Sequence, residues 1–489
     1  MQCKQFTTYA ANGEAIQDEK EITVTREADE ASHLESGVLN IYPDITYQKI
    51  DGFGGAMTET SAFLLAKMDA SMRKAALEEF FGEEGSQFKF LRVHMDSCDF
   101  SLDEYTAVED PMADPELNTF SLKRDQMYIL PVLKEAMEIS KEPLCVLLSP
   151  WSPPACWKTP PARPKNDRSI YGNIFGFQMP EVDYEKPSRL NGGSLRPEFY
   201  ESWARYLVKF VEAYLQEGIP VTMMSIQNES IAATNWDSCV WTSGQQKTFL
   251  RDFLYPEFER AGLTGKVGIY IWDHNKERVL EYASDILDDV TNAMVEGIAF
   301  HWYSGDHFEA VEMTGRKFPG KVLMSSECCG LHKPGRTGFM ELFGSGKTPE
   351  TVEYEDALSY AHDIIGNLNA GMNRWIDWNL CVDKDGGPRH VPDGFTASMI
   401  ANEDGTYRKN LTYYYTRHFS RYIHPGAVRI GHSRCNDKIE MTAVKNEDGS
   451  IAVVLLNKNE DQEYAIRLEG KVIRLKVPGR TINTLVIGG

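Results

Sequence analysis

The chain has 489 residues, of which 42% are hydrophobic and 25% charged, and its formal net charge is −21. This composition is typical of a globular protein with a substantial core, long enough for one large domain and a smaller one. The acidic surface argues against nucleic acid as a partner and against stable membrane association, because both need a basic face.

The first residues, MQCKQFTTYAANGEAIQDEK, contain no basic segment followed by an apolar run. No other stretch approaches the roughly 18 apolar residues of a membrane span. Nine cysteines are spread along the chain without the density of a disulfide scaffold. We therefore expect a reduced, cytoplasmic protein, or a secreted one if a leader was removed; homo-oligomer formation stays open.

The first 45 residues contain a strand-like run, EITVTREAD, with no helical segment between it and the next strands. The last 74 residues (416–489) consist of short alternating runs separated by turn residues, such as NEDGS and NKNEDQ. This pattern is typical of an antiparallel β module. Because the N-terminal strand has no helical partner, we expect residues 1–45 to join residues 416–489 in one β-sandwich.

Between these ends, residues 46–415 alternate short β-rich runs with longer helical stretches, such as 61–82 and 196–218. Eight β-rich runs occur, at 49–59, 88–100, 143–154, 221–229, 266–275, 297–306, 321–330 and 371–380. Eight such repeats predict an α/β fold, a (β/α)8 TIM barrel. The alternative, an open doubly wound sheet, is less favoured because no glycine fingerprint follows the first strand.

Each of the eight runs ends in polar or aromatic residues. In a (β/α)8 barrel the carboxyl ends of the strands converge on one mouth, where the active site lies. The residues at these ends are Glu59, Arg92, Asp96, Trp151, Asn228, Glu229, Trp272, Asp273, His301, Tyr303, Glu327, Trp378 and Asn379. A polar residue at one strand end is usually a cap, but eight such ends predict a functional site.

Two of these residues are carboxylic acids at the ends of the fourth and seventh strands, Glu229 and Glu327. These strands lie across the mouth of a barrel, so their carboxyl groups can face one ligand from two sides. Glycoside hydrolysis needs such a pair, one carboxyl group to donate a proton and one to remain ionised.

The neighbouring residues fit that division of roles. Asn228 can hydrogen-bond the 2-hydroxyl of a sugar, and Tyr303 with His301 can hold an ionised Glu327. Several tryptophans close to the strand ends, Trp151, Trp236, Trp241, Trp302 and Trp378, offer flat faces for sugar rings, although core packing is an equally good explanation for any one of them.

Other chemistries lack their sequence signals. His94, Asp96, Cys98 and Asp99 include metal-binding residue types, but alternate residues of a strand point to opposite faces. The chain contains no CxxC pair, no HExxH, no GxSxG and no GxxxxGK[ST] motif. We expect neither a catalytic metal nor a cofactor.

Several motifs, in order along the chain, resemble those of glycoside hydrolase family 30, and its glucosylceramidase (acid β-glucosidase) branch is the most similar. They are DGFGGAMTETSA, LLSPWSPPACWKT, SIQNES, HWY, SSECCG, WIDWNL, GGPRHV and HFSRYIHPGAVRI. The resemblance covers most of the chain. It implies a (β/α)8 barrel with a β-sandwich built from both termini, and hydrolysis with retention through a covalent glycosyl-enzyme.

Carried over motif by motif, the resemblance makes Glu229 the acid/base and Glu327 the nucleophile. It places Glu59, Trp151, Asn228 and Trp378 around a glucose subsite. We add Arg92, His301, Tyr303 and Asn379 as predicted substrate-binding residues because they end neighbouring strands. Two departures concern specificity: the family often has Asp where Glu59 stands, and Ser230 replaces the commoner proline after the acid/base.

The sequence thus predicts a retaining hydrolase of terminal β-glucosyl residues whose partner is a carbohydrate substrate. The same mechanism on another glycan is the first alternative, as a β-1,6-glucanase, β-xylosidase or β-fucosidase, or with glucosylceramide as the substrate. A non-catalytic sugar-binding protein is disfavoured, because binding alone does not need two carboxyl groups in different protonation states.

Overall fold

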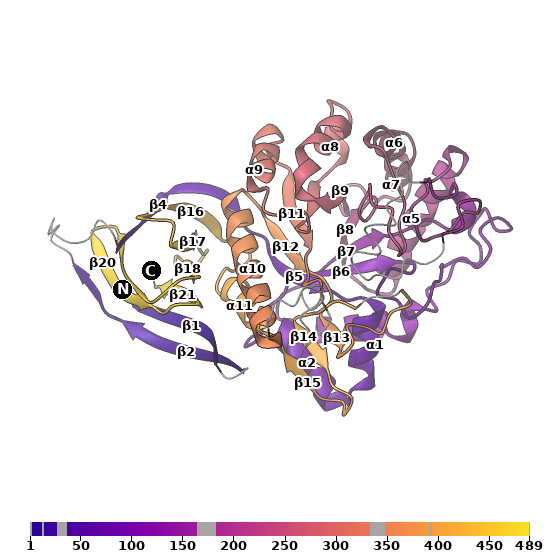
Figure 1. Ribbon diagram of the computed structural model, residues 1–489. Coiled ribbons are helices and arrows are strands. Elements are labelled where there is room, and N and C mark those ends of the chain that lie inside the picture. Colours follow the sequence, from indigo (N-terminus) through magenta and orange to yellow (C-terminus); the bar gives the residue numbers. More distant parts are fainter. Residues whose placement is uncertain are drawn as a thin grey trace.

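The computed structural model describes residues 2–11, 14–26, 37–163, 182–332, 348–391 and 394–488. These residues form a closed barrel of eight strands, a ten-stranded sheet and a small three-stranded sheet. The barrel and the ten-stranded sheet lie side by side, with helices α10 (Pro349–Asn369) and α11 (Leu411–Ser420) between them (Figure 1). The predicted fold class, a (β/α)8 barrel with a β-sandwich from both chain ends, is confirmed.

The eight barrel strands are parallel and lie within the eight predicted runs. They are β5 (Gly52–Ala56), β6 (Phe90–Met95), β7 (Cys145–Pro150), β8 (Val221–Ser225), β9 (Gly268–Asn275), β10 (Gly297–His301), β11 (Val322–Glu327) and β12 (Arg374–Asp377). The last strand pairs with the first from Arg374↔Gly52 to Asp377↔Gly55. This pairing closes the barrel and excludes an open sheet.

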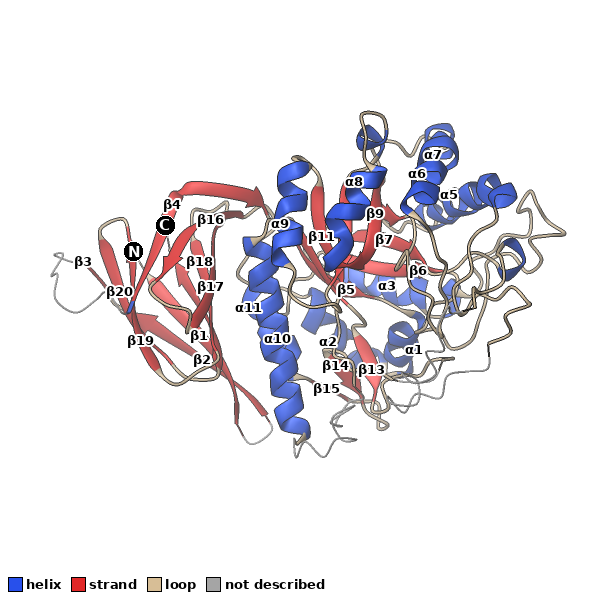
Figure 2. Cartoon of the chain, turned by 45° about the horizontal axis from the view of Figure 1, so that its top comes forward, coloured by secondary structure: helices blue, strands red, loops and turns tan. Residues whose placement is uncertain are grey.

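Helices cover the outside of the barrel (Figure 2). Their bounds are α1 (Glu59–Lys67), α2 (Ala70–Phe81), α3 (Ile129–Ile139), α5 (Tyr200–Gln216), α6 (Ser243–Phe249), a π-helical segment η5 (Leu250–Leu254), α7 (Tyr255–Arg260), α8 (Val279–Ile286) and α9 (Phe308–Lys317). Short 3-10 turns are η2 (Asp125–Met127), η3 (Ala155–Trp157), η4 (Pro197–Phe199), η6 (Lys276–Arg278) and η7 (Thr291–Met294). Helix α5 shows why they dock: Trp203, Leu207, Phe210 and Tyr214 recur every three or four residues and are buried.

The long helical stretch predicted over residues 61–82 is two helices rather than one. Helix α1 ends at Lys67, and Asp69 begins α2 by accepting hydrogen bonds from the backbone N–H groups of Ser71 and Met72, both at 2.9 Å. An aspartate in this position satisfies two N–H groups that have no partner within the helix. The periodicity continues through the break, but the cap restarts the helix in a new direction.

One apolar layer fills the interior of the barrel, and seven strands each contribute a side chain to it. Its members are Phe90, Leu147, Met223, Tyr270, Ala299, Met324 and Ile376. The eighth strand, β5, passes this layer at Gly54, where a Cβ atom would lie 2.1 Å from the carbonyl oxygen of Phe90. Only glycine allows the two backbones to approach so closely.

Two residues further along most strands, the inward-facing side chains become polar. These are Arg92, Ser149, Ser225, His301 and Ser326. Side chains alternate along a strand, so a residue two positions on lies on the same face, one layer higher. Ser149 Oγ accepts hydrogen bonds from Arg92 Nε at 3.2 Å and from Ser225 Oγ at 2.9 Å. The barrel thus changes from apolar to polar directly beneath its mouth.

The β-sandwich is the ten-stranded sheet, and four of its strands come from the N-terminus. These are β1 (Cys3–Ala11), β2 (Glu14–Ile22), β3 (Val24–Arg26) and β4 (Val38–Lys49). The C-terminal strands are β16 (Val428–Arg434), β17 (Ile439–Lys445), β18 (Ile451–Asn457), β19 (Gln462–Leu468), β20 (Lys471–Val477) and β21 (Thr481–Ile487). Pairing of β1 with β21 and of β4 with β16 and β19 joins the two chain ends around one apolar core.

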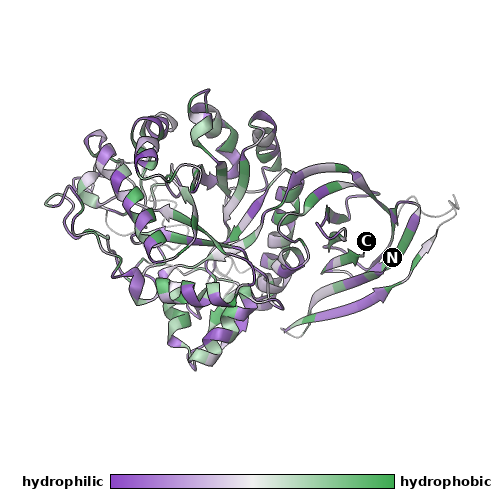
Figure 3. Ribbon diagram, turned by 180° about the vertical axis from the view of Figure 1, so that it is seen from behind, coloured by the Kyte–Doolittle hydropathy of each residue, from purple (hydrophilic) through white to green (hydrophobic). Residues whose placement is uncertain are grey.

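The N-terminal run EITVTREAD, predicted as one isolated strand, is divided between two strands. Residues up to Ile22 belong to β2, β3 begins at Val24, and residues 27–29 lie outside the described residues. Strand β2 is hydrophilic and exposed along most of its length (Figure 3). Its charged side chains suit an edge strand, because they oppose pairing with another molecule.

The small sheet consists of β13 (Cys381–Asp383), β14 (Met399–Ala401) and β15 (Tyr407–Lys409). It follows the last barrel strand and leads into α11, which packs against the β-sandwich. On α11, the ring nitrogens of the buried His418 lie 2.8 Å from the hydroxyl groups of Thr8 and Thr484. Among the described helices, none is long and apolar enough to cross a membrane.

Candidate active site

A cavity of about 410 Å³ opens at the carboxyl ends of the barrel strands. Its lining residues are Asp99, Trp151, Asn228, Glu229, Ala232, Thr234, Asn235, Trp236, His274, Asn275, Tyr303, Glu327, Cys329, Leu331, Trp378 and Phe395. The volume lies within the range of sites that bind small molecules. In a (β/α)8 barrel this end of the strands is where the active site is found.

The two predicted catalytic carboxyl groups face this cavity from different strands. Glu229 follows β8 and Glu327 ends β11, and their residues are only 9% and 7% exposed. Between them lies His301, whose Nδ1 is 3.5 Å from Glu229 Oε1 and 4.0 Å from Glu327 Oε1. The structure therefore brings both carboxyl groups close to the same nitrogen of one imidazole ring.

The Glu327 carboxylate is held from two sides. Arg92, fully buried beneath it, donates a hydrogen bond to Oε2, and the Tyr303 hydroxyl donates to Oε1 at 2.9 Å. The same guanidinium group donates to Asn228 Oδ1 at 2.8 Å and to Asp273 Oδ2 at 2.9 Å. Arg92 thus fixes Glu327 and Asn228 relative to one another.

The backbone at Glu229 adopts a left-handed conformation, with φ of 49°. Four other residues share it: Asp96 and Asn379 lie just after their strands, and Trp272 and Asp273 lie at a register shift within β9. Each such non-glycine residue costs about 1–3 kcal/mol, and such residues concentrate at functional sites. Here two of these residues are joined, because the Glu229 N–H donates to the Asp273 carbonyl at 2.8 Å.

Two histidines lie against Glu229. His301 Nε2 is 3.1 Å from Asp273 Oδ1, and its Nδ1 faces Glu229; His274 Nδ1 lies 3.6 Å from the same Glu229 oxygen. Burial acts to lower the pKa of His301, but the charge of Glu327 and contacts with Asp273 and Glu229 outweigh it and raise the pKa to about 9. Burial lowers the pKa of His274.

The two glutamates influence each other's protonation. Burial raises the pKa of Glu327, and the charge of Glu229 raises it further, while the cationic side chains of His301 and Arg92 oppose this rise. At Glu229 burial acts in the same direction, but the contact with His301 and the charge of His274 lower the pKa. These opposing effects couple the protonation of Glu229, His301 and Glu327 to one another.

Six predicted residues line the cavity: Trp151, Asn228, Glu229, Tyr303, Glu327 and Trp378. Trp151 and Trp378 are stacked, with ring centroids 5.2 Å apart, and Arg92 lies 4.8 Å from the Trp151 ring. The indole pair forms one apolar wall beside the carboxylates. Such a surface suits the apolar face of a sugar ring.

Glu59, predicted to line the sugar subsite, is not among the residues that line this cavity. Glu59 is fully buried, pairs with Arg124 and accepts a hydrogen bond from the Leu102 N–H at 2.9 Å. It is the first residue of α1, so its side chain points into the packing between this helix and the loop after β6. Its role in the structure is to hold that loop.

Three further predicted residues lie behind the cavity wall rather than on it. Arg92 and His301 are fully buried and touch the carboxylates from beneath, so they position Glu327 and Glu229 instead of binding the substrate. Asn379 accepts a hydrogen bond from the Thr58 hydroxyl at 2.6 Å and is also fully buried. The structure therefore does not bring these three predicted substrate-binding residues to the cavity surface.

The structure adds a carboxyl group that the sequence did not single out as a substrate ligand, Asp99. It lines the cavity, is 5% exposed, and its Oδ1 has no hydrogen-bond partner in the described part of the chain. Burial raises its pKa to about 7, although the charge of Arg389, 3.7 Å away, acts against the rise. His274, Asn275, Trp236 and Phe395 also line the cavity.

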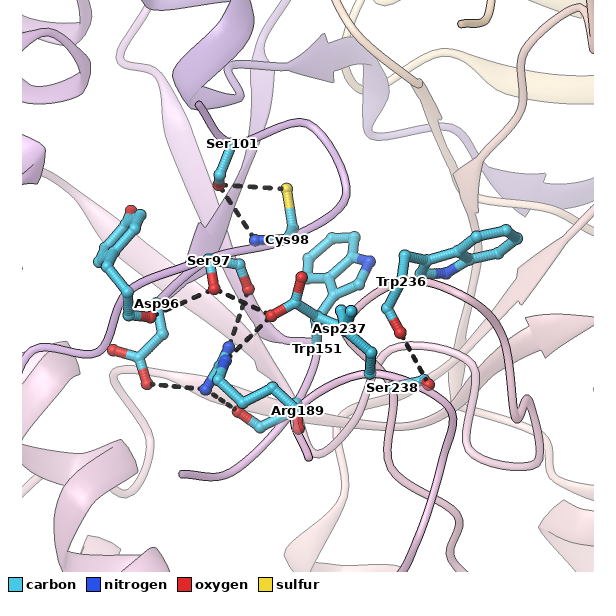
Figure 4. A network of polar contacts seen from close by, with 12 residues as sticks. Asp96, Ser97, Cys98, Ser101, Trp151, Arg189, Trp236, Asp237 and Ser238 are labelled. Atoms are coloured by element: carbon cyan, nitrogen blue, oxygen red, sulfur yellow. Dashed lines mark hydrogen bonds and ion pairs between the residues drawn. The ribbon is translucent and has the colours of Figure 1, made fainter. Parts of the chain in front are cut away.

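A buried polar network holds the loops that carry Asp99 and Trp236. Figure 4 shows Arg189 between Asp237, 2.9 Å away, and Asp96, 3.7 Å away, while Ser97 Oγ donates to Asp237 at 2.9 Å. Because Asp96 and Ser97 follow β6 and Asp237 follows β8, the network joins loops from different strands. No short motif in the sequence indicates it.

A (β/α)8 barrel with two buried carboxyl groups facing one cavity, one of them held by an arginine and a tyrosine, defines a glycoside hydrolase. Residues 50–173 and 183–423 match the Glycosyl hydrolase family 30 TIM-barrel domain, and residues 426–485 match the Glycosyl hydrolase family 30 beta sandwich domain. The chain belongs to glycosyl hydrolase family 30 and hydrolyses O-glycosyl bonds. The predicted family resemblance is confirmed.

Similar proteins include glucosylceramidases and a glucanase. The lysosomal acid glucosylceramidase of Mus musculus is 30% identical over 442 residues, which cover 87% of this chain and 78% of the mouse protein. The crystal structure of SrfJ from Salmonella typhimurium is 28% identical with a TM-score of 0.86, and that of the endo-beta1,6-glucanase BT3312 is 26% identical with a TM-score of 0.81. Both structural matches cover 100% of each chain.

Proposed function

We propose that this chain hydrolyses terminal β-linked glucosyl residues by double displacement. Glu327 acts as the nucleophile and Glu229 as the acid/base. The observation that carries the assignment of roles is the pair of donors on Glu327, Arg92 and Tyr303, which stabilise an ionised carboxylate. Glu229 has no comparable arginine contact and faces imidazole nitrogens instead.

In the first step, Glu327 attacks the anomeric carbon while Glu229 gives its proton to the departing glycosidic oxygen. His301 Nδ1, 3.5 Å away, is close enough to share the proton with Glu229. A sugar that displaces water from the cavity favours the neutral pair over the ion pair, because separated charges cost more in a dry site. In the second step, Glu229 takes a proton from water, which attacks the glycosyl-enzyme at the anomeric carbon.

The cavity offers contacts suited to one sugar ring. Asn228 Oδ1 is occupied by Arg92, so its NH2 group is the part available to a sugar 2-hydroxyl. Asp99 offers an unpartnered carboxyl oxygen for hydroxyl groups further round the ring, beside the stacked Trp151 and Trp378. These contacts support a site that closes around a terminal residue.

A second candidate is an endo-acting β-1,6-glucanase, which a specific observation favours. A second cavity of about 330 Å³ shares Tyr303, Cys329 and Leu331 with the first, and it continues along Trp302 and Asp306. It provides room for a further sugar next to the first cavity. The endo-beta1,6-glucanase BT3312 is 26% identical over the whole chain, in support of the same alternative.

We also propose that the substrate is a soluble β-glucoside or oligosaccharide, met in the cytoplasm, and that glucosylceramide is the less favoured alternative. The net charge of −21 supports this, because a surface that binds anionic lipid needs clustered basic residues. Glucosylceramide in vesicles therefore belongs in any substrate panel.

The test of the catalytic roles uses Glu327→Gln, Glu229→Gln and, as a matched control, Glu257→Gln. Glu257 is a buried glutamate paired with Arg260 on α7, away from the cavity. With a dinitrophenyl β-glucoside, whose leaving group needs no proton, Glu229→Gln should release a burst of phenol and then turn over slowly. Glu327→Gln should show no burst, and the control should retain turnover.

With an alkyl β-glucoside, which needs protonation, Glu229→Gln should lose about 10²–10⁴-fold in kcat/KM. A panel of aryl glucoside, xyloside and fucoside together with a β-1,6-glucan separates the two candidates. An active, correctly folded Glu327→Gln would overturn the assignment. Glucan cleavage at internal bonds without aryl glucoside turnover would replace the first candidate with the second.

A further inference from the structure

Three side chains at the edge of the cavity point their ligand atoms at one spot. Glu229 Oε1 lies 3.6 Å from His274 Nδ1 and 3.5 Å from His301 Nδ1, and the ligand atoms of the three residues all lie within 4.8 Å of one another. His274 is 8% exposed and His301 fully buried, yet neither Nδ1 has a hydrogen-bond partner in the described part of the chain. Two buried, unpartnered nitrogens are thus aimed at one carboxylate oxygen.

The spacing suits a tetrahedral ion. Zinc binds histidine nitrogen at about 2.0–2.1 Å and carboxylate oxygen at about 2.0–2.2 Å, so neighbouring ligand atoms of a tetrahedral site lie roughly 3.3–3.5 Å apart. The separation of 3.5 Å from Glu229 Oε1 to His301 Nδ1 lies within this range, and the 3.6 Å to His274 Nδ1 exceeds it by about a tenth of an ångström. Three protein ligands leave the fourth position for water, which the cavity lined by Glu229 and His274 can supply.

The surroundings of His301 resemble the outer shell of a metal site. Asp273 Oδ1 lies 3.1 Å from His301 Nε2, and Asp273 is itself held by Arg92 at 2.9 Å and by the Ser326 hydroxyl at 2.6 Å. A carboxylate that accepts from one ring nitrogen places the proton there and directs the lone pair of the other nitrogen outward. In His301 that other nitrogen is Nδ1, which faces Glu229; an ion that binds there displaces the Nδ1 proton of the cationic ring and leaves the Nε2 proton toward Asp273.

We propose that Glu229, His274 and His301 form an inhibitory binding site for a divalent ion that prefers imidazole, namely Zn²⁺ or Cu²⁺. One carboxylate and two imidazoles suit these ions and not Mg²⁺ or Ca²⁺, which require mainly oxygen ligands. A bound ion occupies the lone pair of Glu229 that must carry the proton and excludes the glycosidic oxygen from the same place. The inhibitory consequence rests on the proposed function, whereas ion binding does not.

The binding experiment uses the full chain, freed of metals with a chelator, and ZnCl₂ or CoCl₂ as the probe. The wild type should bind one Zn²⁺, and Co²⁺ should produce the intense visible bands of a tetrahedral site. His274→Gln should bind Zn²⁺ at least tenfold more weakly and lose the bands; even outer-shell partners are worth about 10–100-fold in affinity. His424→Gln, at an exposed histidine between α11 and β16, is the control and should bind as the wild type does.

Thermal unfolding of each variant shows whether it folds, and Glu229→Gln provides a second, independent removal of a ligand. Wild-type binding without tetrahedral bands, or equal affinity in His274→Gln, overturns the site. In the activity arm, Zn²⁺ should abolish glycoside hydrolysis by the wild type and EDTA should restore it, while MgCl₂ has no effect. Tetrahedral binding that leaves hydrolysis unchanged overturns the inhibitory role. If the wild type has no glycosidase activity, the proposed function is wrong, but the binding experiment still tests the metal site.

Discussion

At the scale of single residues, the site is a set of carboxyl groups distinguished by what they contact. Glu327 receives donors from Arg92 and Tyr303, Glu229 faces two imidazoles, and Asp99 has an oxygen without a partner. Glu59 is equally buried but is already paired with Arg124. Chemical identity alone does not separate these acids, because their partners decide which one meets the substrate.

Asp99 is therefore expected to bind sugar hydroxyl groups. Above pH 7, where the Asp99 carboxyl is ionised, replacing it by asparagine removes a charged hydrogen-bond acceptor worth about 1.5–3 kcal/mol, so kcat/KM for an aryl β-glucoside should fall roughly 10–150-fold. Steady-state kinetics checks the loss, and calorimetry with a glucose-like inhibitor checks that binding weakens by a similar factor.

The comparison variant is Glu59→Gln, which tests whether Glu59 binds sugar or only holds the loop after β6. Its carboxylate holds the loop after β6 through Arg124 and the Leu102 N–H, so the variant should unfold at a lower urea concentration. Its inhibitor affinity should stay within twofold of the wild type when measured well below the unfolding transition. The reverse result, a stable Glu59→Gln that binds sugar poorly, would restore Glu59 to the subsite.

The sequence predicts which residues end the barrel strands, and this was enough to find Glu229, Glu327 and Asn228. It does not predict how far a side chain stands from the cavity. His301 ends β10, whereas Arg92 lies within β6, three residues before its end, and both are buried beneath the cavity, against the carboxylates. The depth depends on strand stagger around the closed barrel, which no local pattern reveals.

At the scale of elements, the loops at the barrel mouth are joined by buried polar groups, among which Lys158 is central. Its ammonium group donates to Ser152 Oγ at 2.9 Å and to the carbonyl oxygens of Ser188, Arg189 and Ser238 at 2.8, 3.2 and 2.6 Å. Burial lowers its pKa to about 8. One side chain thus ties the loop after β7 to the loop after β8.

Replacing Lys158 by methionine keeps the apolar stem but leaves several buried oxygens without a donor. We expect a loss of stability on the order of 3–5 kcal/mol, measured by urea unfolding. Lys186→Met in the same segment is the control, because Lys186 is 80% exposed and its loss should cost less than about 0.5 kcal/mol. Equal effects of the two changes would contradict the role assigned to Lys158.

The N-terminal strands show which strand pairings a local sequence pattern can predict and which it cannot. The dipeptide Asn12-Gly13, between two β-rich runs, is a typical hairpin signal and could have indicated β1 and β2. Pairing of β1 with β21 joins residues at opposite ends of the chain, such as Cys3 and Ile487. Such a register depends on long-range packing, and a local pattern cannot specify it.

At the scale of the whole molecule, α10 and α11 connect the barrel to the β-sandwich. On α11, His418 bridges Thr8 and Thr484, and burial lowers its pKa to about 3, so this contact is made by a neutral ring. On α10, His362 contacts Glu440 of β17 through Nδ1 at 2.6 Å and Asp306 of the barrel through Nε2 at 3.1 Å. Unlike the His418 contact, the two His362 contacts join the ring to carboxylates and should depend on pH.

The hydrogen bond to Glu440 raises the pKa of His362, and the contact with Asp306 adds to this, although burial and the charge of Lys458 oppose it. A raised pKa in the folded state means that the protonated ring stabilises the fold. The contribution is fully present below the ordinary histidine pKa of about 6.5 and is lost as the pH rises through the raised value. Burial acts to raise the pKa of Glu440, but hydrogen bonds from His362 and Lys458 outweigh it and lower the pKa. The Glu440 carboxylate therefore stays ionised in mildly acidic solution.

His362→Gln should therefore lower the free energy of unfolding by about 1 kcal/mol at pH 6 and by much less at pH 9, measured by urea unfolding at both values. His424→Gln, at an exposed histidine near the same interface, should show no such difference. A loss at pH 9 as large as at pH 6 would mean that the neutral ring makes the contact. The junction between barrel and sandwich would then be held by packing and by His418, without a charged contribution from His362.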